Sequence, residues 1–347
     1  MESNSDHDEL PWDLCEYRML VLAKLISIDI DAEKYAYDNI QPFLVSKEPR
    51  IRQLTAKALF TPLLSCRGDA FLNPIVSFLL EDIRRNMYTR DIEWKPAVLG
   101  QVNEVVSVDD DVGWNTLETS MYALKVLVSQ LQTDSQLPSI LFNKENMDLL
   151  IKSSSIHRSR HIKQAGLEIA SALLMHDNKH CHDDYFVTVI RDATVICLDD
   201  NWTQVRYTAG ITARSLLLKY TGRDTFIHIY IQGLYLYSSS SFFATGKEDS
   251  LYHQLYQTLL PRICMNRFYA ADGVRNHSQE TWKLTMGMEG RNNLCLVIED
   301  VMSHYVKASC AANHMVAEAA CEAIVSTMYI DKATTQSHCS LQYHDYW

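Results

Sequence analysis

The sequence predicts an all-α protein, and three of its features support that prediction. Only 11 glycines and 8 prolines occur among 347 residues, too few for the tight turns of an all-β fold or the glycine loops of an α/β enzyme. The apolar content of 47% is enough to fill a packed core. Steps of four and three place one apolar stripe along a helix at Leu117, Met121, Leu124, Val128 and Leu131.

Helical patterns follow one another along most of the chain. The first starts at Pro11 and places Leu14, Met19, Leu22 and Ile26 near one face. None of the patterns is long enough for a coiled coil. Besides the stripe over residues 117–131, helices are expected over residues 74–86, 139–152, 161–175, 183–198, 203–220, 250–264, 292–310 and 314–329.

Turn residues separate these patterns. Residues 109–113, 238–246 and 287–290 contain the aspartates, serines or glycines that indicate loops. The connection over residues 86–113 is long for a helical hairpin and is expected to be an insertion on one face. Residues 226–237 alternate apolar and aromatic side chains as a strand would. An isolated strand would leave its backbone groups without partners, so a helix is favoured there.

Four segments share one layout, in which a polar or proline-containing turn precedes a branched apolar residue, commonly a base, and then small residues. The best copy spans residues 200–217, its nearest parallel spans 47–59, and weaker copies span 161–170 and 313–324. Alanine or glycine at the small positions lets the second helix of a hairpin approach its neighbour closely. The buried stripe expected in the best copy consists of Val205, Ala209, Ala213, Leu216 and Leu217.

This layout resembles the second helix of HEAT repeats, in which a Val-Arg pair precedes the small residues. Val205-Arg206 and Ile51-Arg52 match that pair, and the other two copies lack the aligned arginine. The interval from His161 to Val205 fits the HEAT period of roughly 40–47 residues. The resemblance implies a superhelical solenoid of antiparallel helical hairpins of the HEAT or armadillo type. An ordinary bundle of alanine-rich helices is the alternative.

The expected organisation is a single array over residues 11–330 with the insertion near 86–113. An acidic tail over residues 1–10, expected to be disordered, precedes the array, and a polar tail over residues 331–347 follows it. A solenoid needs a polar cap, yet residues 316–328 form an apolar repeat helix directly before the second tail. We therefore expect either a further chain that caps the last repeat or a truncated or alternative end of a longer array.

Composition bears on partners and location. The formal charge of −11 and the pI near 5.6 argue against a nucleic-acid surface, which needs clustered lysine and arginine. No apolar run approaches the roughly 20 residues of a membrane span, and residues 1–10 carry no secretory pattern. The nine cysteines are scattered without C-x-x-C spacing, so neither a disulfide framework nor a zinc site is indicated. We expect a cytoplasmic protein, with the nucleus as the alternative, and no cofactor.

One segment is a weak candidate for metal binding. His176, His180 and His182 lie with one cysteine and three aspartates in residues 176–184. Because no second ligand pair occurs at zinc-finger spacing, a solvated turn is favoured over a metal site. The sequence motifs of acyl transfer, phosphate binding and metal hydrolysis are absent. We therefore predict a protein that is not an enzyme, with a helical enzyme or metal-handling domain built on this cluster as the alternative.

Basic residues gather near the starts of the expected second helices. Pairing with acids such as Asp199 and Asp200 in a ladder between repeats is the favoured interpretation. The functional interpretation is that some of them line a groove for an acidic peptide or helix, which stacked hairpins would provide. The favoured function is a scaffold or adaptor that binds a protein partner. Its candidate partner-binding residues are Arg158, Arg160, Lys163, Arg206 and Arg214.

Overall fold

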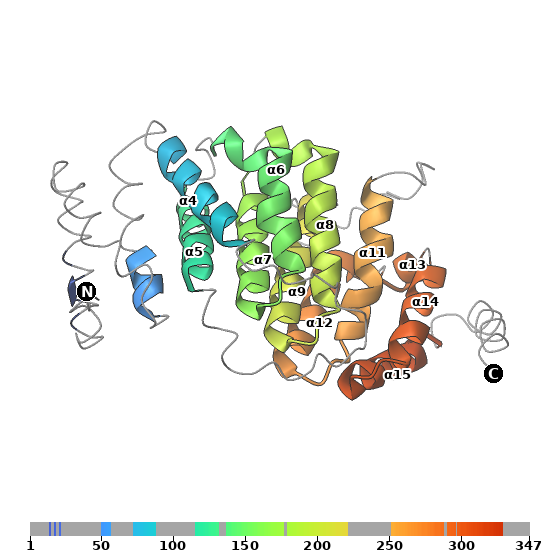
Figure 1. The fold of residues 1–347 in the computed structure, drawn as a ribbon. Coiled ribbons are helices and arrows are strands. Elements are labelled where there is room, and N and C mark those ends of the chain that lie inside the picture. The colour runs from blue at the N-terminus through green and yellow to red at the C-terminus, as the bar shows by residue number, and fades with distance from the viewer. Residues whose placement is uncertain are drawn as a thin grey trace. The chain divides into compact units, whose positions relative to one another are not determined.

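Every regular element that the computed structural model describes is a helix, so the all-α prediction is confirmed for those residues (Figure 1). The expectations for the two tails, for residues 226–237 and for most of the 86–113 connection lie outside the described residues. None of the described helices is both long and apolar enough to cross a membrane. The described residues are 14, 17–18, 21, 50–56, 72–87, 115–131, 137–176, 179–220, 251–287, 290–295 and 297–328.

Contacts divide the chain into two units. The first comprises Met1–Lys95 and Val105–Ile190, and the second comprises Pro96–Glu104 and Arg191–Trp347. The division falls within helix α8 (Asp184–Leu198). Within each unit, most helix contacts join elements that are close in chain order, which is the packing order of stacked hairpins in a helical-repeat array.

In the first unit, helix α5 (Asn115–Gln130) packs against both α4 (Leu72–Met87) and α7 (Arg160–Leu174). The predicted stripe explains this central position, because an amphipathic helix is stable only when its apolar face is covered. The stripe is confirmed: the four fully buried members are Leu117, Met121, Leu124 and Val128, and Leu131 is half-buried.

The single helix expected over residues 139–152 consists of three short elements. They are the 3-10 turn η3 (Ser139–Phe142), α6 (Lys144–Met147) and the wide π-helical turn η4 (Asp148–Ser153). Helix α6 begins where the side chain of Asn143 accepts a hydrogen bond from the backbone N–H of Asn146.

A small residue of the repeat layout sets the approach of α7 to the preceding turn. A Cβ atom added to Gly166 would lie 1.8 Å from Oγ of Ser154 and 2.9 Å from the backbone oxygen of Leu150. Only glycine fits at this distance. The predicted role of the small positions is therefore confirmed in the copy over residues 161–170.

In the second unit, helix α9 (Thr203–Tyr220) packs on α12 (Asp272–Met286), and α11 (Leu251–Asn266) contacts α12. Helices α14 (Ile298–Ser309) and α15 (His314–Met328) pack on each other and on α11. The stripe predicted in the best repeat copy is confirmed, since its five members are fully buried: Val205, Ala209, Ala213, Leu216 and Leu217.

Two features of the second unit differ from the expectations. The helix expected over residues 292–310 is two helices, α13 (Gly290–Cys295) and α14, because Val297 leaves the helical region at φ −126° and ψ 26°. Helix α12 was not among the expected helices. Its buried face is largely polar, with Ser278, Thr281 and Thr285 on it, so apolar periodicity does not reveal the helix.

Candidate partner-binding site

Arg206, a candidate partner-binding residue, lies in the interior of the second unit with 1% of its surface exposed. Its Nε donates to the backbone oxygen of Asp200 at 3.0 Å, and its Nη1 donates to Oδ1 of Asn266 at 2.8 Å. The guanidinium carbon lies 4.6 Å from the centre of the Tyr269 ring. Burial lowers the pKa of Arg206 from its ordinary value. Arg206 thus joins α9 to the end of α11 and is not presented to a partner.

Asp199 pairs with Arg262 rather than with any of the five candidate bases. Nε of Arg262 lies 2.8 Å from Oδ2 of Asp199, and both side chains are largely buried. Nε2 of His304 lies 3.8 Å from the other carboxylate oxygen of Asp199. Burial nevertheless lowers the pKa of His304 to about 4, against the opposing effect of Asp199. His304 is therefore neutral near pH 7, and the charge of Asp199 is balanced by Arg262.

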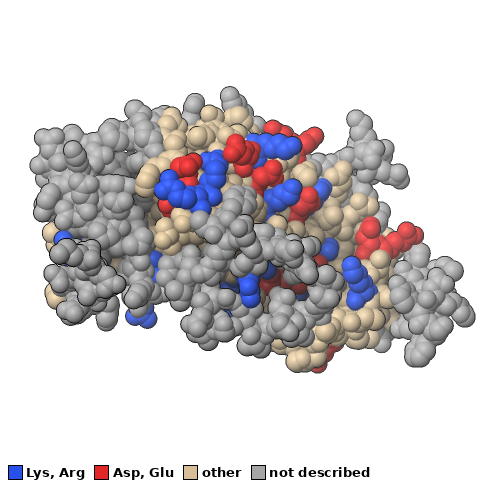
Figure 2. Space-filling view, viewed as in Figure 1, with Lys and Arg blue, Asp and Glu red and all other residues tan. Residues whose placement is uncertain are grey.

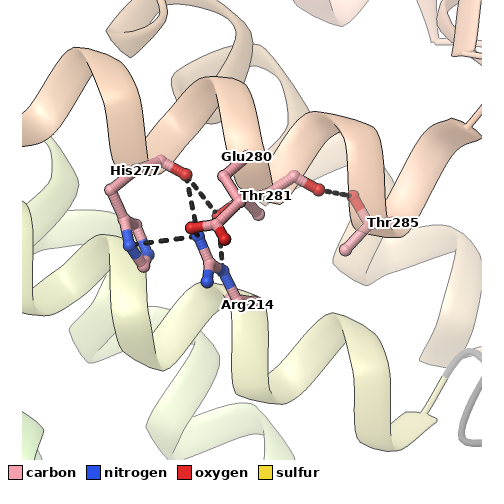
Figure 3. Close-up of polar contacts among 5 residues, drawn as sticks. All are labelled: Arg214, His277, Glu280, Thr281 and Thr285. Carbon is pink, nitrogen blue, oxygen red and sulfur yellow. Dashed lines mark hydrogen bonds and ion pairs between the residues drawn. The ribbon is translucent and has the colours of Figure 1, made fainter. Parts of the chain in front are cut away.

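Arg214 occupies a different environment, at the edge of the contact between α9 and α12 (Figure 3). Its Nε donates to Oγ1 of Thr281 at 2.9 Å. Its Nη2 lies 3.0 Å from the backbone oxygen of His277 and 2.9 Å from Oε2 of Glu280. No described residue accepts a hydrogen bond from the other terminal nitrogen, Nη1, which carries no dashed line in Figure 3. The guanidinium group is thus held in place, and its Nη1 has no acceptor among the described residues.

The protonation states around Arg214 follow from its charge. Nδ1 of His277 lies 3.1 Å from Nη2 of Arg214. A guanidinium nitrogen can only donate, so Nδ1 accepts and the neutral imidazole carries its proton on Nε2. Burial lowers the pKa of His277, and the charge of Arg214 lowers it further. The hydrogen bond from Arg214 and its charge lower the pKa of Glu280. Near neutral pH the group is a neutral histidine beside an Arg–Glu ion pair.

An exposed aromatic residue lies on the same side of α9. Tyr207 precedes Arg214 by seven residues, about two helical turns, and is 40% exposed. Its ring meets that of His277 edge to face, with the ring centres 5.3 Å apart. Gly273 of α12 lies alongside, since a Cβ atom there would be 4.0 Å from the Tyr207 ring. We name Tyr207, Arg214, Gly273, His277 and Glu280 the α9–α12 surface.

The other three candidate bases belong to the first unit. Arg158 is exposed in the turn before α7. Arg160 is half-buried, and its Nε lies 3.4 Å from Nε2 of His161. Lys163 is buried. Next to them, burial lowers the pKa of His157 to about 4. Of this group, Arg158 has the most accessible side chain.

Several basic side chains on the described surface lie beside acids. Lys125 pairs with Glu168 at 3.3 Å, and Arg84 pairs with Glu81 and Glu145, each at 3.1 Å. Figure 2 shows blue and red side chains next to each other on the described part of the face drawn, where neither colour forms a large patch. The basic side chains on the described part of this face therefore form no continuous basic field.

The histidines of the weak metal candidate have other contacts. Nε2 of His176 lies 2.9 Å from the backbone oxygen of Val128, and the imidazole is buried. The ring of His180 stacks on Phe142 with centres 5.1 Å apart. The side chain of His182 lies outside the described residues. The described part of the chain contains no group of three residues that could hold a metal ion.

Sequence reasoning named Arg214 but missed its partners on α12. Apolar periodicity does not reveal the helix that contains His277, Glu280 and Thr281, because the buried face of that helix is largely polar. In the printed sequence they stand more than 60 residues from Arg214.

Comparison with known proteins finds a likeness among solved structures. No protein-family model matches the chain, and no curated protein matches it. Among solved structures, it resembles a designed armadillo repeat protein in complex with the peptide (KR)4 at 12% identity and a TM-score of 0.34. The match covers 89% of this chain and 98% of the designed protein. At that TM-score the fold assignment rests on the helices and their packing order.

Proposed function

We propose that this protein is a non-catalytic scaffold or adaptor that binds a segment of another protein at the α9–α12 surface. The supporting observation is Arg214, which is fixed by acceptors from α12 while its Nη1 has no acceptor among the residues that the structure describes. A donor already held in position loses little conformational entropy when it binds. The exposed ring of Tyr207 supplies apolar contact area with a hydrogen-bonding hydroxyl, as tyrosines do at many interfaces.

The charges of the α9–α12 surface narrow the class of ligand. Glu280 already balances Arg214, and His277 is neutral near pH 7, so the surface carries no net positive charge. Nη1 therefore suits one backbone carbonyl or one carboxylate oxygen better than a long acidic run. In place of the expected acidic peptide or helix, we therefore propose a segment that places one oxygen acceptor against Nη1. A cytoplasmic or nuclear location belongs to the same proposal.

Affinity purification from the native lysate, with mass spectrometry at moderate and at high salt, tests this proposal. Tyr207→Ala and Arg214→Ala should each lower recovery of a stoichiometric partner about tenfold, because truncated interface anchors commonly cost more than about 1 kcal/mol. Ser303→Ala, an exposed position on α14, is the control and should leave recovery unchanged. Equal recovery of the partner with all three variants would contradict binding at the α9–α12 surface.

The enzyme alternative makes a different prediction for the same purified protein. Stoichiometric metal that is lost on replacing His176, His180 and His182 would favour a metal-handling function. The hydrogen bond of His176 and the stacking of His180 instead support structural roles for these two side chains.

A further inference from the structure

Helix α15 has one face that no other described helix covers. Its other side packs on α14 and α11 and buries Val316, Ala320 and Ala323. The uncovered face contains exposed Glu318, Cys321, Glu322 and Val325. These residues follow the i, i+3, i+4 and i+7 pattern, which places their side chains on one face of a helix. Val325 is 55% exposed.

The charge of this face has one sign. Helix α15 contains no lysine or arginine, and its last turn has none of the basic side chains that commonly occupy helix C-termini. Glu318 and Glu322 therefore lie next to each other along one side of Cys321 and Val325, without a basic neighbour in the helix itself. The partial negative charge of the C-terminal carbonyl groups adds to the glutamates. The result is a small apolar strip with an acidic edge on one side.

We propose that this α15 face (Glu318, Cys321, Glu322 and Val325) binds an amphipathic helix of another protein that carries lysine or arginine beside its apolar stripe. Helices dock in this way when an apolar strip meets an apolar strip and the flanking charges are opposite. The inference rests on the proposed scaffold function and adds a second surface and the chemistry of its partner.

Two other occupants fit the face less well. A second copy of the chain would bring its own Glu318 and Glu322 against the same residues, and like charges repel across a helix pair. The chain's own residues 331–347 contain Lys332 as their one lysine or arginine, with Asp331 and Asp345. They cannot supply a row of bases beside an apolar stripe.

The first experiment measures binding of a fluorescein-labelled amphipathic peptide with a leucine stripe flanked by lysines, using fluorescence anisotropy on the full chain. Val325→Asp should weaken binding at least about tenfold, because it places a charge in the apolar contact. Glu318→Gln with Glu322→Gln should weaken it about threefold to tenfold at low salt. Glu299→Gln with Asp300→Asn on α14 changes the net charge equally and should leave the affinity unchanged.

Cysteine footprinting locates the contact. Cys295, Cys310 and Cys321 are all exposed and free, so the first two serve as internal references for the third. The lysine peptide should slow alkylation of Cys321 by iodoacetamide at least about fivefold, since a docked helix excludes reagent from its contact, and should leave the references unchanged.

Three outcomes would overturn the inference: equal weakening by both charge-neutralised pairs, no selective protection of Cys321, or a dimer that Val325→Asp dissociates. Partner recovery with Tyr207→Ala is a separate readout. Failure at α15 therefore leaves the α9–α12 proposal to be judged by its own test.

Discussion

Replacing the buried Arg206 with alanine should destabilise the second unit far more than the same change at Arg214. Arg206→Ala removes two charge-assisted hydrogen bonds and leaves Oδ1 of Asn266 and the Asp200 carbonyl oxygen without that donor. Each hydrogen bond from a charged donor contributes about 1.5–3 kcal/mol, so the loss of both should cost about 3–5 kcal/mol. Arg214 lies at an edge that water can reach, with 19% of its side chain exposed, so Arg214→Ala should cost about 1 kcal/mol.

Urea unfolding followed by circular dichroism at 222 nm and by tryptophan fluorescence measures this difference. Tryptophans occur in both units, with Trp202 and Trp282 among those of the second, so fluorescence reports two steps if the two units unfold separately. The account predicts a lower midpoint for Arg206→Ala with an unchanged slope, and a small shift for Arg214→Ala. A loss of less than about 1 kcal/mol for Arg206→Ala would refute the structural role assigned to it.

Two further predictions concern stability. Burial lowers the pKa of His157 and of His304 to about 4, so the folded protein binds fewer protons than the unfolded chain between about pH 4 and pH 6.5. Stability should therefore fall as the pH drops from 7, by about 2 kcal/mol for each histidine at pH 5, and denaturation of His304→Gln at both pH values should show a smaller fall. Gly166→Ala should lower the free energy of unfolding by about 1–3 kcal/mol, because the new Cβ meets Ser154. Gly273→Ala, where the nearest atom is 4.0 Å away, should leave it unchanged or raise it by up to about 1 kcal/mol in the same denaturation assay.

Apolar periodicity predicted the parts of the fold whose buried faces are apolar. The stripes on α5 and α9 are buried as expected, and α7 and α15 contain the small residues of the repeat layout. Helix α12 was missed because serine and threonine face its neighbours, where each hydroxyl can bond to a backbone oxygen one turn earlier, as Thr281 and Thr285 do. The break at Val297 was missed because the apolar pattern continues across it.

The candidate site shows a second limit of sequence reasoning. Arg206 and Arg214 lie eight residues apart on one helix, and the sequence treats them alike. Their roles differ because Arg206 meets Asn266, 60 residues further along the chain, whereas Arg214 meets Glu280. Long-range packing decides which arginine is enclosed, and a single sequence does not contain that information in its local pattern.

Site-specific photo-crosslinking tests the central claim most directly. The protein would carry p-benzoylphenylalanine in place of Tyr207 in one sample and in place of Ser303 in another, and both would be irradiated in the native lysate. The account predicts a single abundant adduct at position 207 that Arg214→Ala removes, and no such adduct at position 303. The same adducts at both positions, or none at position 207, would contradict binding at the α9–α12 surface.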